Sequence, residues 1–263
     1  MNYVQKYQSP LGYTHYSGKM TKEIIFPRDR QNPDMIHKYF RDEAMAMSRL
    51  GIPVSIEPHD TSQKLIHRGF IIRNPEDYPS DSRYIQGWKE YEATSKLSIV
   101  YPLIQDICIP TFFVDNLDES VIRFIHQRGW EKAFIKKDVK SLWVNGELAS
   151  VWPYHSIDEL RDEYEGRNPG EKYAIREFLD PALFYNEERY WVIMGKIYHR
   201  SRVIPDIIKT AADRLAVLGS HYYTIDAVED YIVEVNPGES SDRLGANSAE
   251  LFASWWQDAL KRI

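Results

Sequence analysis

The chain has 263 residues, of which 43% are hydrophobic and 27% charged, a balance that indicates a packed globular protein and argues against global disorder. Its net charge of -6 argues against a general nucleic-acid binder. The single cysteine, Cys108, excludes an intrachain disulfide and is expected to be a buried thiol. The sequence has no apolar signal core and no apolar run of membrane-spanning length, so we expect a cytoplasmic protein without a membrane partner.

The first part of the chain has the pattern of a strand, a helix and a second strand. Residues 23–26 and 53–57 are short strand candidates, and Asn32-Pro33 between them is typical of a helix start. Apolar residues then recur at helical spacing as far as Leu50, and Gly51 is expected to end the helix. This pattern predicts a small α/β lobe with a parallel pair of strands, and it carries no glycine-rich phosphate loop.

Five further elements are predicted before residue 130. Residues 65–72 are expected to form a strand, 74–82 a loop and 84–98 a helix. A strand over 109–114 and a helix over 117–129 follow.

A strand with a cluster of lysines follows at residues 131–141, EKAFIKKDVKS. Because side chains alternate between faces, Lys136 and Lys137 are expected to point in opposite directions. A lysine on a strand beside phosphates supplies a compact positive charge, and this stretch ends with Lys137 and then Lys140. A charged strand end at the surface is the alternative.

Two more strand regions carry polar candidates. Residues 172–180, KYAIREFLD, predict a half-buried strand that ends near Glu177 and Phe178. Residues 186–198 predict a hairpin with its turn at 194–196. The charged residues at its start are Glu187, Glu188 and Arg189.

Two arginines follow that hairpin. Arg200 and Arg202 are same-face neighbours if the strand continues, and arginine suits bidentate binding of phosphate or carboxylate. A solvated basic edge is the alternative. Residues 205–218 then predict a helix that Gly219 ends, and Ser248 is expected to cap the final helix.

The stretch YYTIDAVEDYIVEVNP, residues 222–237, predicts a hairpin that carries hard oxygen ligands. Glu234 and Asn236 share one face of its second strand, and Asp226 lies on the first. Two acids and an amide are ligands that Mg²⁺ accepts beside phosphate oxygens. A regular two-residue turn would send Asp226 and Glu234 to opposite faces, so we predict an odd loop or a bulge between Val228 and Ile232.

In this order the motifs resemble those of ATP-grasp enzymes. That family carries a lysine strand, a hinge strand, an acid-arginine hairpin, and a closing Asp with Glu-x-Asn, and the resemblance covers roughly residues 109–263. Family members usually have proline after the lysine, where this chain has Asp138. The chain is therefore more similar to a divergent clade with an arginine-and-lysine signature.

The resemblance implies an α/β (α+β) fold of the ATP-grasp type with a small N-terminal α/β lobe. The lobe would span residues 1–108. An ATP-grasp domain, in which two α+β subdomains sandwich ATP, would span residues 109–263.

The resemblance also assigns roles at the site. Mg²⁺ would be held by Asp226, Glu234 and Asn236. The residues expected to bind ATP are Lys137, Lys140, Glu177, Phe178, Glu187 and Glu188. The residues expected to stabilise the transferring phosphate or the acceptor are Arg189, Arg200 and Arg202.

The reaction that the resemblance implies is ATP-dependent ligation of a carboxylate to an amine. It would proceed through an acylphosphate, form an amide or peptide bond, and release ADP and phosphate. The substrates would be small-molecule or peptide acids and amines, with no nucleic acid involved. A kinase that phosphorylates a hydroxyl, and a nucleotide-binding module without catalysis, are the alternatives. The sequence has no Walker loop, no G-x-S-x-G and no H-E-x-x-H motif that would favour another class.

Overall fold

The computed structural model describes residues 22–58, 63–130, 133–138, 143–144, 147–148, 172–201 and 203–262. Two predicted site residues, Lys140 and Arg202, lie outside these ranges. Within them, no helix is both long and apolar enough to cross a bilayer. The strands of this part form four sheets.

The N-terminal lobe contains a parallel three-stranded sheet, which confirms the predicted parallel pair. Its strands are β1 (Lys22–Ile25), β2 (Val54–Ser55) and β3 (Lys64–His67), in the order β2-β1-β3. The predicted strand over 65–72 therefore ends early, at His67. A short η2 turn (Pro75–Asp77) lies within the expected loop.

The predicted start of the first helix at Asn32-Pro33 was wrong. The backbone N–H of Met35 donates to the Asn32 carbonyl, and that of Asp29 donates to the Met35 carbonyl, so this segment closes on itself as a loop. The helix begins later, with η1 (Lys38–Phe40) and then α1 (Arg41–Arg49). Gly51, at φ 77°, follows its end as expected.

The single helix predicted over 84–98 is two helices. These are α2 (Trp88–Ser95) and α3 (Leu97–Ile104), with Lys96 extended between them. Asp138 accounts for the break, because its carboxylate accepts from the Ser98 N–H at 2.7 Å and its carbonyl accepts from the Leu97 N–H at 3.1 Å. The aspartate that departs from the expected proline thus caps α3.

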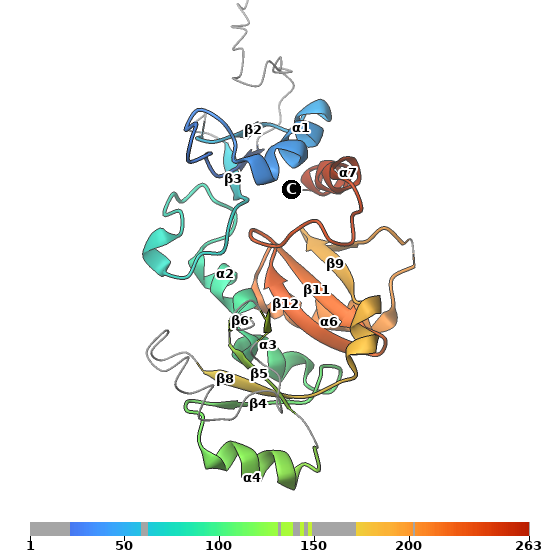
Figure 1. Cartoon of the computed structure of the whole chain (residues 1–263). Coiled ribbons are helices and arrows are strands. Elements are labelled where there is room, and N and C mark those ends of the chain that lie inside the picture. Colours follow the sequence, from blue (N-terminus) through green and yellow to red (C-terminus); the bar gives the residue numbers. More distant parts are fainter. Residues whose placement is uncertain are drawn as a thin grey trace, which may run out of the picture.

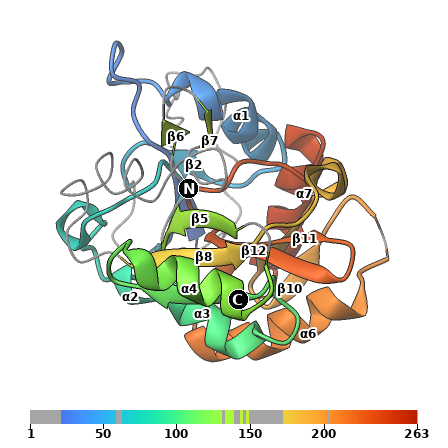
Figure 2. The same cartoon turned by 60° about the horizontal axis from the view of Figure 1, so that its bottom comes forward.

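A second sheet lies below the others in Figure 1, with a helix on its outer face. Its antiparallel strands are β4 (Thr111–Val114), β5 (Ala133–Lys137) and β8 (Tyr173–Glu177), in the order β4-β8-β5. The predicted helix α4 (Glu119–Gln127) covers it, and Val121 and Ile125 belong to the same buried cluster as Ile135 and Ile175 (Figures 1 and 2). Two short strands, β6 (Trp143–Val144) and β7 (Glu147–Leu148), pair with each other.

The central sheet is antiparallel, in the order β10-β9-β11-β12. Its strands are β9 (Glu188–Ile193), β10 (Lys196–Tyr198), β11 (Tyr222–Val228) and β12 (Tyr231–Pro237). They confirm both predicted hairpins, and η3 (Pro181–Asn186) precedes β9. The sheet is buried on both faces, so β11 has no exposed residue.

The helices around the central sheet divide its two faces between separate cores. On one face, Val192 and Ile225 cluster with residues of α3 and of α6 (Asp206–Leu215), which continues as η4 (Ala216–Leu218). On the other face, Trp191 and Tyr222 cluster with the N-terminal lobe and with α7 (Ala249–Leu260). In Figure 1, α7 lies beside α1, so the last helix of the described residues packs against the N-terminal lobe.

The predicted pairing of Asp226 with Glu234 is confirmed, but the source of the odd residue was placed wrongly. The turn at Glu229-Asp230 has two residues, because Val228 pairs with Tyr231. The register shifts next to Asp226, and Val233 is the extra residue of β12. A bulge outside the predicted interval 228–232 thus brings both carboxylates to one face.

Candidate active site

Three charged side chains form a row across three neighbouring strands of the central sheet. Asp226 of β11 is opposite Arg189 of β9 on one side and Glu234 of β12 on the other. Arg189 donates from Nε and Nη2 to the two oxygens of Asp226, both at 2.7 Å, and from Nη1 to Asp242 at 2.6 Å. The row lies on the sheet face that carries Trp191, because residues two apart share a face.

Asn236 joins the two carboxylates of the row. Its Nδ2 atom lies 3.2 Å from Asp226 Oδ2 and 3.0 Å from Glu234 Oε2. The structure thus brings together all three residues that the sequence predicted as metal ligands.

Lys136 of β5 reaches this group from the other sheet. Its ammonium group forms an ion pair with Glu234, and its side chain is 3% exposed. The neighbouring Lys137, which the sequence analysis favoured for phosphate binding, lies instead over the ring of Tyr173, with Nζ 3.6 Å from the ring centroid. As predicted, the side chains of Lys136 and Lys137 point in opposite directions. The structure places Lys136, rather than Lys137, at the carboxylates.

Burial and charge act against each other at the acids of the site. Burial raises the pKa of Glu234, but Lys136 and Asn236 outweigh burial and lower it to about 2. Burial also raises the pKa of Asp226, and its contact with Arg189 opposes that shift. Burial and the charges of Asp226 and Glu234 raise the pKa of Glu187 to about 7. Lys136 and Asn236 therefore favour the ionised form of Glu234, whereas burial favours the protonated forms of Asp226 and Glu187.

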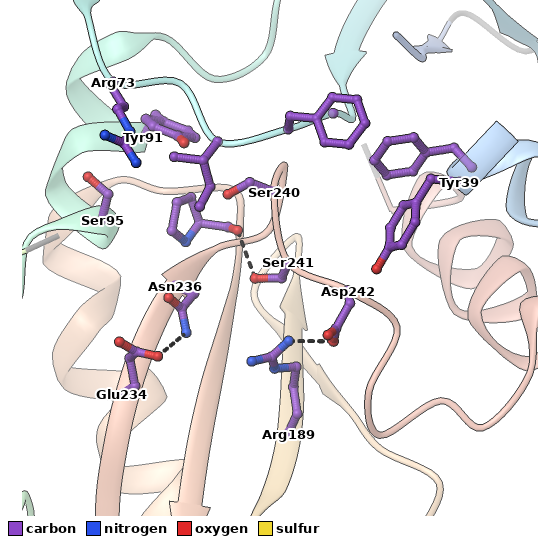
Figure 3. A pocket seen from close by; sticks show the side chains of 15 residues that line it. Tyr39, Arg73, Tyr91, Ser95, Arg189, Glu234, Asn236, Ser240, Ser241 and Asp242 are labelled. Atoms are coloured by element: carbon purple, nitrogen blue, oxygen red, sulfur yellow. Dashed lines mark hydrogen bonds and ion pairs between the residues drawn. The ribbon is translucent and has the colours of Figure 1, made fainter. Parts of the chain in front are cut away.

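A pocket of about 550 Å³ opens above these residues. Its floor includes Arg189, Glu234 and Asn236, which come from the central sheet (Figure 3). Residues of the N-terminal lobe and of α2 form other walls, and Figure 3 shows Arg73, Tyr91 and Ser95 on one side and Tyr39 on the other. The charged row therefore faces a space that a ligand can enter.

Glu188 and Arg200 form a pair that is separate from the charged row. Arg200 donates to Glu188 at 2.7 Å and to Asn247 at 3.1 Å, and His199 Nε2 lies 3.0 Å from the second oxygen of Glu188. Neither Glu188 nor Arg200 lines the 550 Å³ pocket. Glu187, also expected to bind ATP, lies close enough to Asp226 and Glu234 for their charges to raise its pKa.

Glu177 and Phe178, which the resemblance assigns to the hinge strand that would contact the adenine of ATP, lie at the end of β8. The backbone N–H of Glu177 donates to the Pro110 carbonyl at 3.0 Å, so an adenine contact through that N–H would have to displace this bond.

Cys108 is 3% exposed, as predicted, and Arg176 Nη2 lies 3.6 Å from its sulfur.

A buried ion pair that the sequence analysis missed holds the loop after Asn236. Arg68 is 1% exposed and donates to both oxygens of Glu43, at 2.7 and 3.1 Å. Its Nη1 donates to the carbonyls of Gly238 and Glu239 at 3.2 and 2.8 Å. The sequence carries little signal for this pair, because both residues come from a lobe with no recognisable motif and the further partners of Arg68 are backbone carbonyls.

The oxygen donors of the site suit a magnesium ion bound together with phosphate. Among the described residues, no group of three or more His, Cys, Asp or Glu side chains is placed to hold a metal ion. Mg²⁺ in phosphate-binding sites, however, commonly takes one or two carboxylates and completes its shell with water and phosphate oxygens. Glu234 and Asn236 face the pocket and can supply such ligands, whereas Asp226 already has both oxygens bound to Arg189.

No protein-family model matches the sequence, and no curated protein matches it either. Solved structures do resemble the fold. The macrocyclase MdnC from Microcystis aeruginosa MRC, bound with precursor peptide MdnA, is 12% identical with a TM-score of 0.57, over 90% of this chain and 99% of that one. The ATP-grasp ligase PsnB, complexed with a minimal precursor, Mg and ADP, is 10% identical with a TM-score of 0.55, over 93% and 99%.

A third similar structure is that of the D-cycloserine synthetase DcsG. It is 14% identical with a TM-score of 0.56, over 91% of this chain and 99% of that one. At such low identity the likeness concerns the fold alone, but it extends over nearly the whole of each chain. The order of the sheets and the similarity to these structures show that the chain adopts the ATP-grasp fold.

Proposed function

We propose that this chain is an ATP-dependent carboxylate–amine ligase that acts through an acylphosphate. The observation that carries the proposal is the row Arg189–Asp226–Glu234, paired with Lys136 from a second sheet. Two residues of the row, Arg189 and Glu234, line the pocket together with Asn236. Cations and hard oxygen ligands at one point are what phosphoryl transfer requires.

The proposed reaction has two steps. A carboxylate oxygen of the acid attacks the γ-phosphorus of ATP, and the bond from that phosphorus to the β–γ bridging oxygen breaks, so that ADP leaves. The amine then attacks the acyl carbon, phosphate leaves, and the amine proton passes to solvent. The chain needs no nucleophile of its own, only groups that align the reactants and balance charge.

The residues of the row would divide these tasks. Glu234 and Asn236 would hold Mg²⁺, with Asp226 behind them, and the ion would neutralise charge on the phosphate oxygens. The ammonium group of Lys136 would exchange its contact with Glu234 for one with a phosphate oxygen of the nucleotide. Arg189 would stabilise the transferring phosphoryl group. Arg200, held by Glu188 and Asn247, would act outside the charged row. Lys137 would support the strand, and Lys140, Glu177, Phe178 and Glu187 are proposed to surround the nucleotide.

A trapping experiment tests the proposal. The chain is incubated with ATP, Mg²⁺, hydroxylamine and a pool of carboxylic acids and peptides, and products are identified by mass spectrometry. We expect ADP, phosphate and a hydroxamate. Glu234→Gln should abolish the hydroxamate, whereas Glu229→Gln, in the exposed turn of the same hairpin, should not. A stable phosphoester without hydroxamate would favour the kinase, and nucleotide binding without any product would favour a module without catalysis.

A further inference from the structure

Two aromatic rings are exposed in the pocket, away from the charged row. Tyr39 is 60% exposed and Phe70 is 49% exposed, and their ring centroids are 6.4 Å apart. Phe70 also packs against His37 and the buried Phe40, at 4.9 and 5.2 Å. Adjacent exposed rings inside a pocket form a surface that an apolar group of a ligand would cover.

Arg73 lies three residues beyond Phe70 in the chain, on the side of the pocket opposite Tyr39 (Figure 3). It is exposed and lines the pocket, and within the described residues it makes no ion pair or hydrogen bond. Arg189, on the floor of the pocket, is by contrast bound by Asp226 and Asp242. Arg73 is therefore the arginine of this pocket that is available to an anionic group of a ligand.

The segment 69–73, which forms part of the pocket wall and carries Phe70 and Arg73, is held in place at two points. The Gly69 N–H donates to the Glu239 carbonyl at 2.8 Å, and the Ile72 N–H donates to the Tyr91 hydroxyl at 2.9 Å. The ring of Phe70 and the guanidinium of Arg73 are thus presented from a fixed backbone. Such a wall binds a ligand with less loss of conformational entropy than a free loop would.

The pocket of about 550 Å³ has room for a ligand larger than one amino acid. A second pocket, of about 330 Å³, adjoins it, because Tyr39 and Asp242 line both. A short peptide fits this extent, with side chains that reach both the rings and the arginine.

We propose that the acid substrate is a peptide whose aromatic side chain packs on Tyr39 and Phe70 and whose acidic side chain, a few residues away, pairs with Arg73. This inference rests on the proposed ligase function and specifies its substrate class. The charge of Arg73 selects the acidic residue, and the exposed rings select the aromatic one.

A binding experiment tests this assignment without requiring turnover. A pool of tripeptides, acetylated at the N-terminus and amidated at the C-terminus, is offered to the full chain with Mg²⁺ and ADP, and retained peptides are identified by mass spectrometry. With both termini blocked, an acidic preference can come only from Asp or Glu side chains. The variants are Arg73→Ala, Arg73→Lys and Phe70→Ser. The control is Arg123→Ala, an exposed arginine on α4 outside both pockets.

We expect the wild type and Arg123→Ala to retain peptides that contain both an aromatic and an acidic residue. Arg73→Ala should lower the acidic preference about tenfold or more, with partial recovery in Arg73→Lys, and Phe70→Ser should lower the aromatic preference. No such preference in the wild type, or an unchanged preference in Arg73→Ala, would overturn the assignment. Selection of these peptides without hydroxamate formation would instead reject the ligase function alone.

Discussion

Lys136 of β5 and Glu234 of β12 are 98 residues apart in the chain and form an ion pair that joins two sheets. The Lys136 side chain is 3% exposed and that of Glu234, which lines the pocket, is 27% exposed, so the pair is only partly screened by water. This contact places a cation where the proposed phosphoryl transfer needs one.

The pair of lysines gives the first prediction. Lys136→Met should lower kcat/KM for ATP about 100-fold or more, because it removes the cation at Glu234, whereas Lys137→Met should lower it less than about tenfold. Methionine keeps most of the side-chain volume, and circular dichroism checks the fold of both variants. A larger effect from Lys137→Met would return the phosphate-binding role to the residue that the sequence analysis favoured.

The buried pair Arg68–Glu43 gives a prediction about stability. Glu43→Gln or Arg68→Met should each lower the free energy of unfolding by about 3–5 kcal/mol, because each leaves one charge or polar group buried without its partner. Urea unfolding measures the change. The double variant should lose less than the sum of the two single variants, and strict additivity would show that the two side chains are not coupled.

Glu239 gives a prediction about pH. It is fully buried, accepts from Tyr78 at 3.1 Å and from Gln86, and has a second oxygen without a partner within the described structure. Burial raises its pKa from 4.5 to about 8, against the effect of these hydrogen bonds. Because the pKa of this acid is raised in the folded state, the stability it contributes is full below pH 4.5 and is lost as pH rises through about 8.

Glu239→Gln removes this titration and keeps the shape of the side chain. We therefore compare the free energy of unfolding of the wild type with that of the variant. The wild type should lose stability relative to the variant by a few kcal/mol as the pH rises from about 5 to about 9, which is on the order of the full linkage effect. Chemical unfolding at several pH values measures it. Glu76→Gln, at an exposed position in η2, is the control. A difference that stays constant with pH would contradict the assignment.

Two glycines give a prediction about the placement of Arg189. Both Gly245 and Gly195 have positive φ, at 91° and 73°, so alanine strains the backbone at either position. A Cβ at Gly195 meets nothing within 4 Å, but a Cβ at Gly245 would overlap the carbonyl oxygen of Arg189. Gly195→Ala should cost about 1–2 kcal/mol of stability with activity retained. Gly245→Ala should also lower kcat about 100-fold by displacing Arg189, and equal activity in the two variants would contradict this.

The closing hairpin shows what the sequence could and could not predict. Because side chains alternate between faces, Asp226 and Glu234 can share a face only if one extra residue lies between them in the hairpin. The need for that residue could therefore be predicted from the sequence. Where that residue sits depends on the local fit of β12 to its neighbours, and the structure places it at Val233 rather than in the turn.

Other differences arose where distant contacts override local pattern. Asn32-Pro33 has the residues of a helix start, but backbone bonds within 29–35 make it a loop. The break at Lys96 depends on Asp138, 42 positions later in the sequence, and the choice between Lys136 and Lys137 depends on the position of a second sheet. The elements with strong periodicity, α4 and α6, and the cap of α7 at Ser248 were predicted correctly.

The measurement that tests the central claim most directly is the fate of the carboxylate oxygens. An acid that yields a hydroxamate is labelled with ¹⁸O in its carboxylate and incubated with the chain, ATP, Mg²⁺ and its amine, and the released phosphate is analysed by mass spectrometry. Formation and breakdown of an acylphosphate transfers one carboxylate oxygen to phosphate, so we predict phosphate that carries ¹⁸O, together with ADP. Unlabelled phosphate, or ¹⁸O found in AMP, would contradict the proposed mechanism.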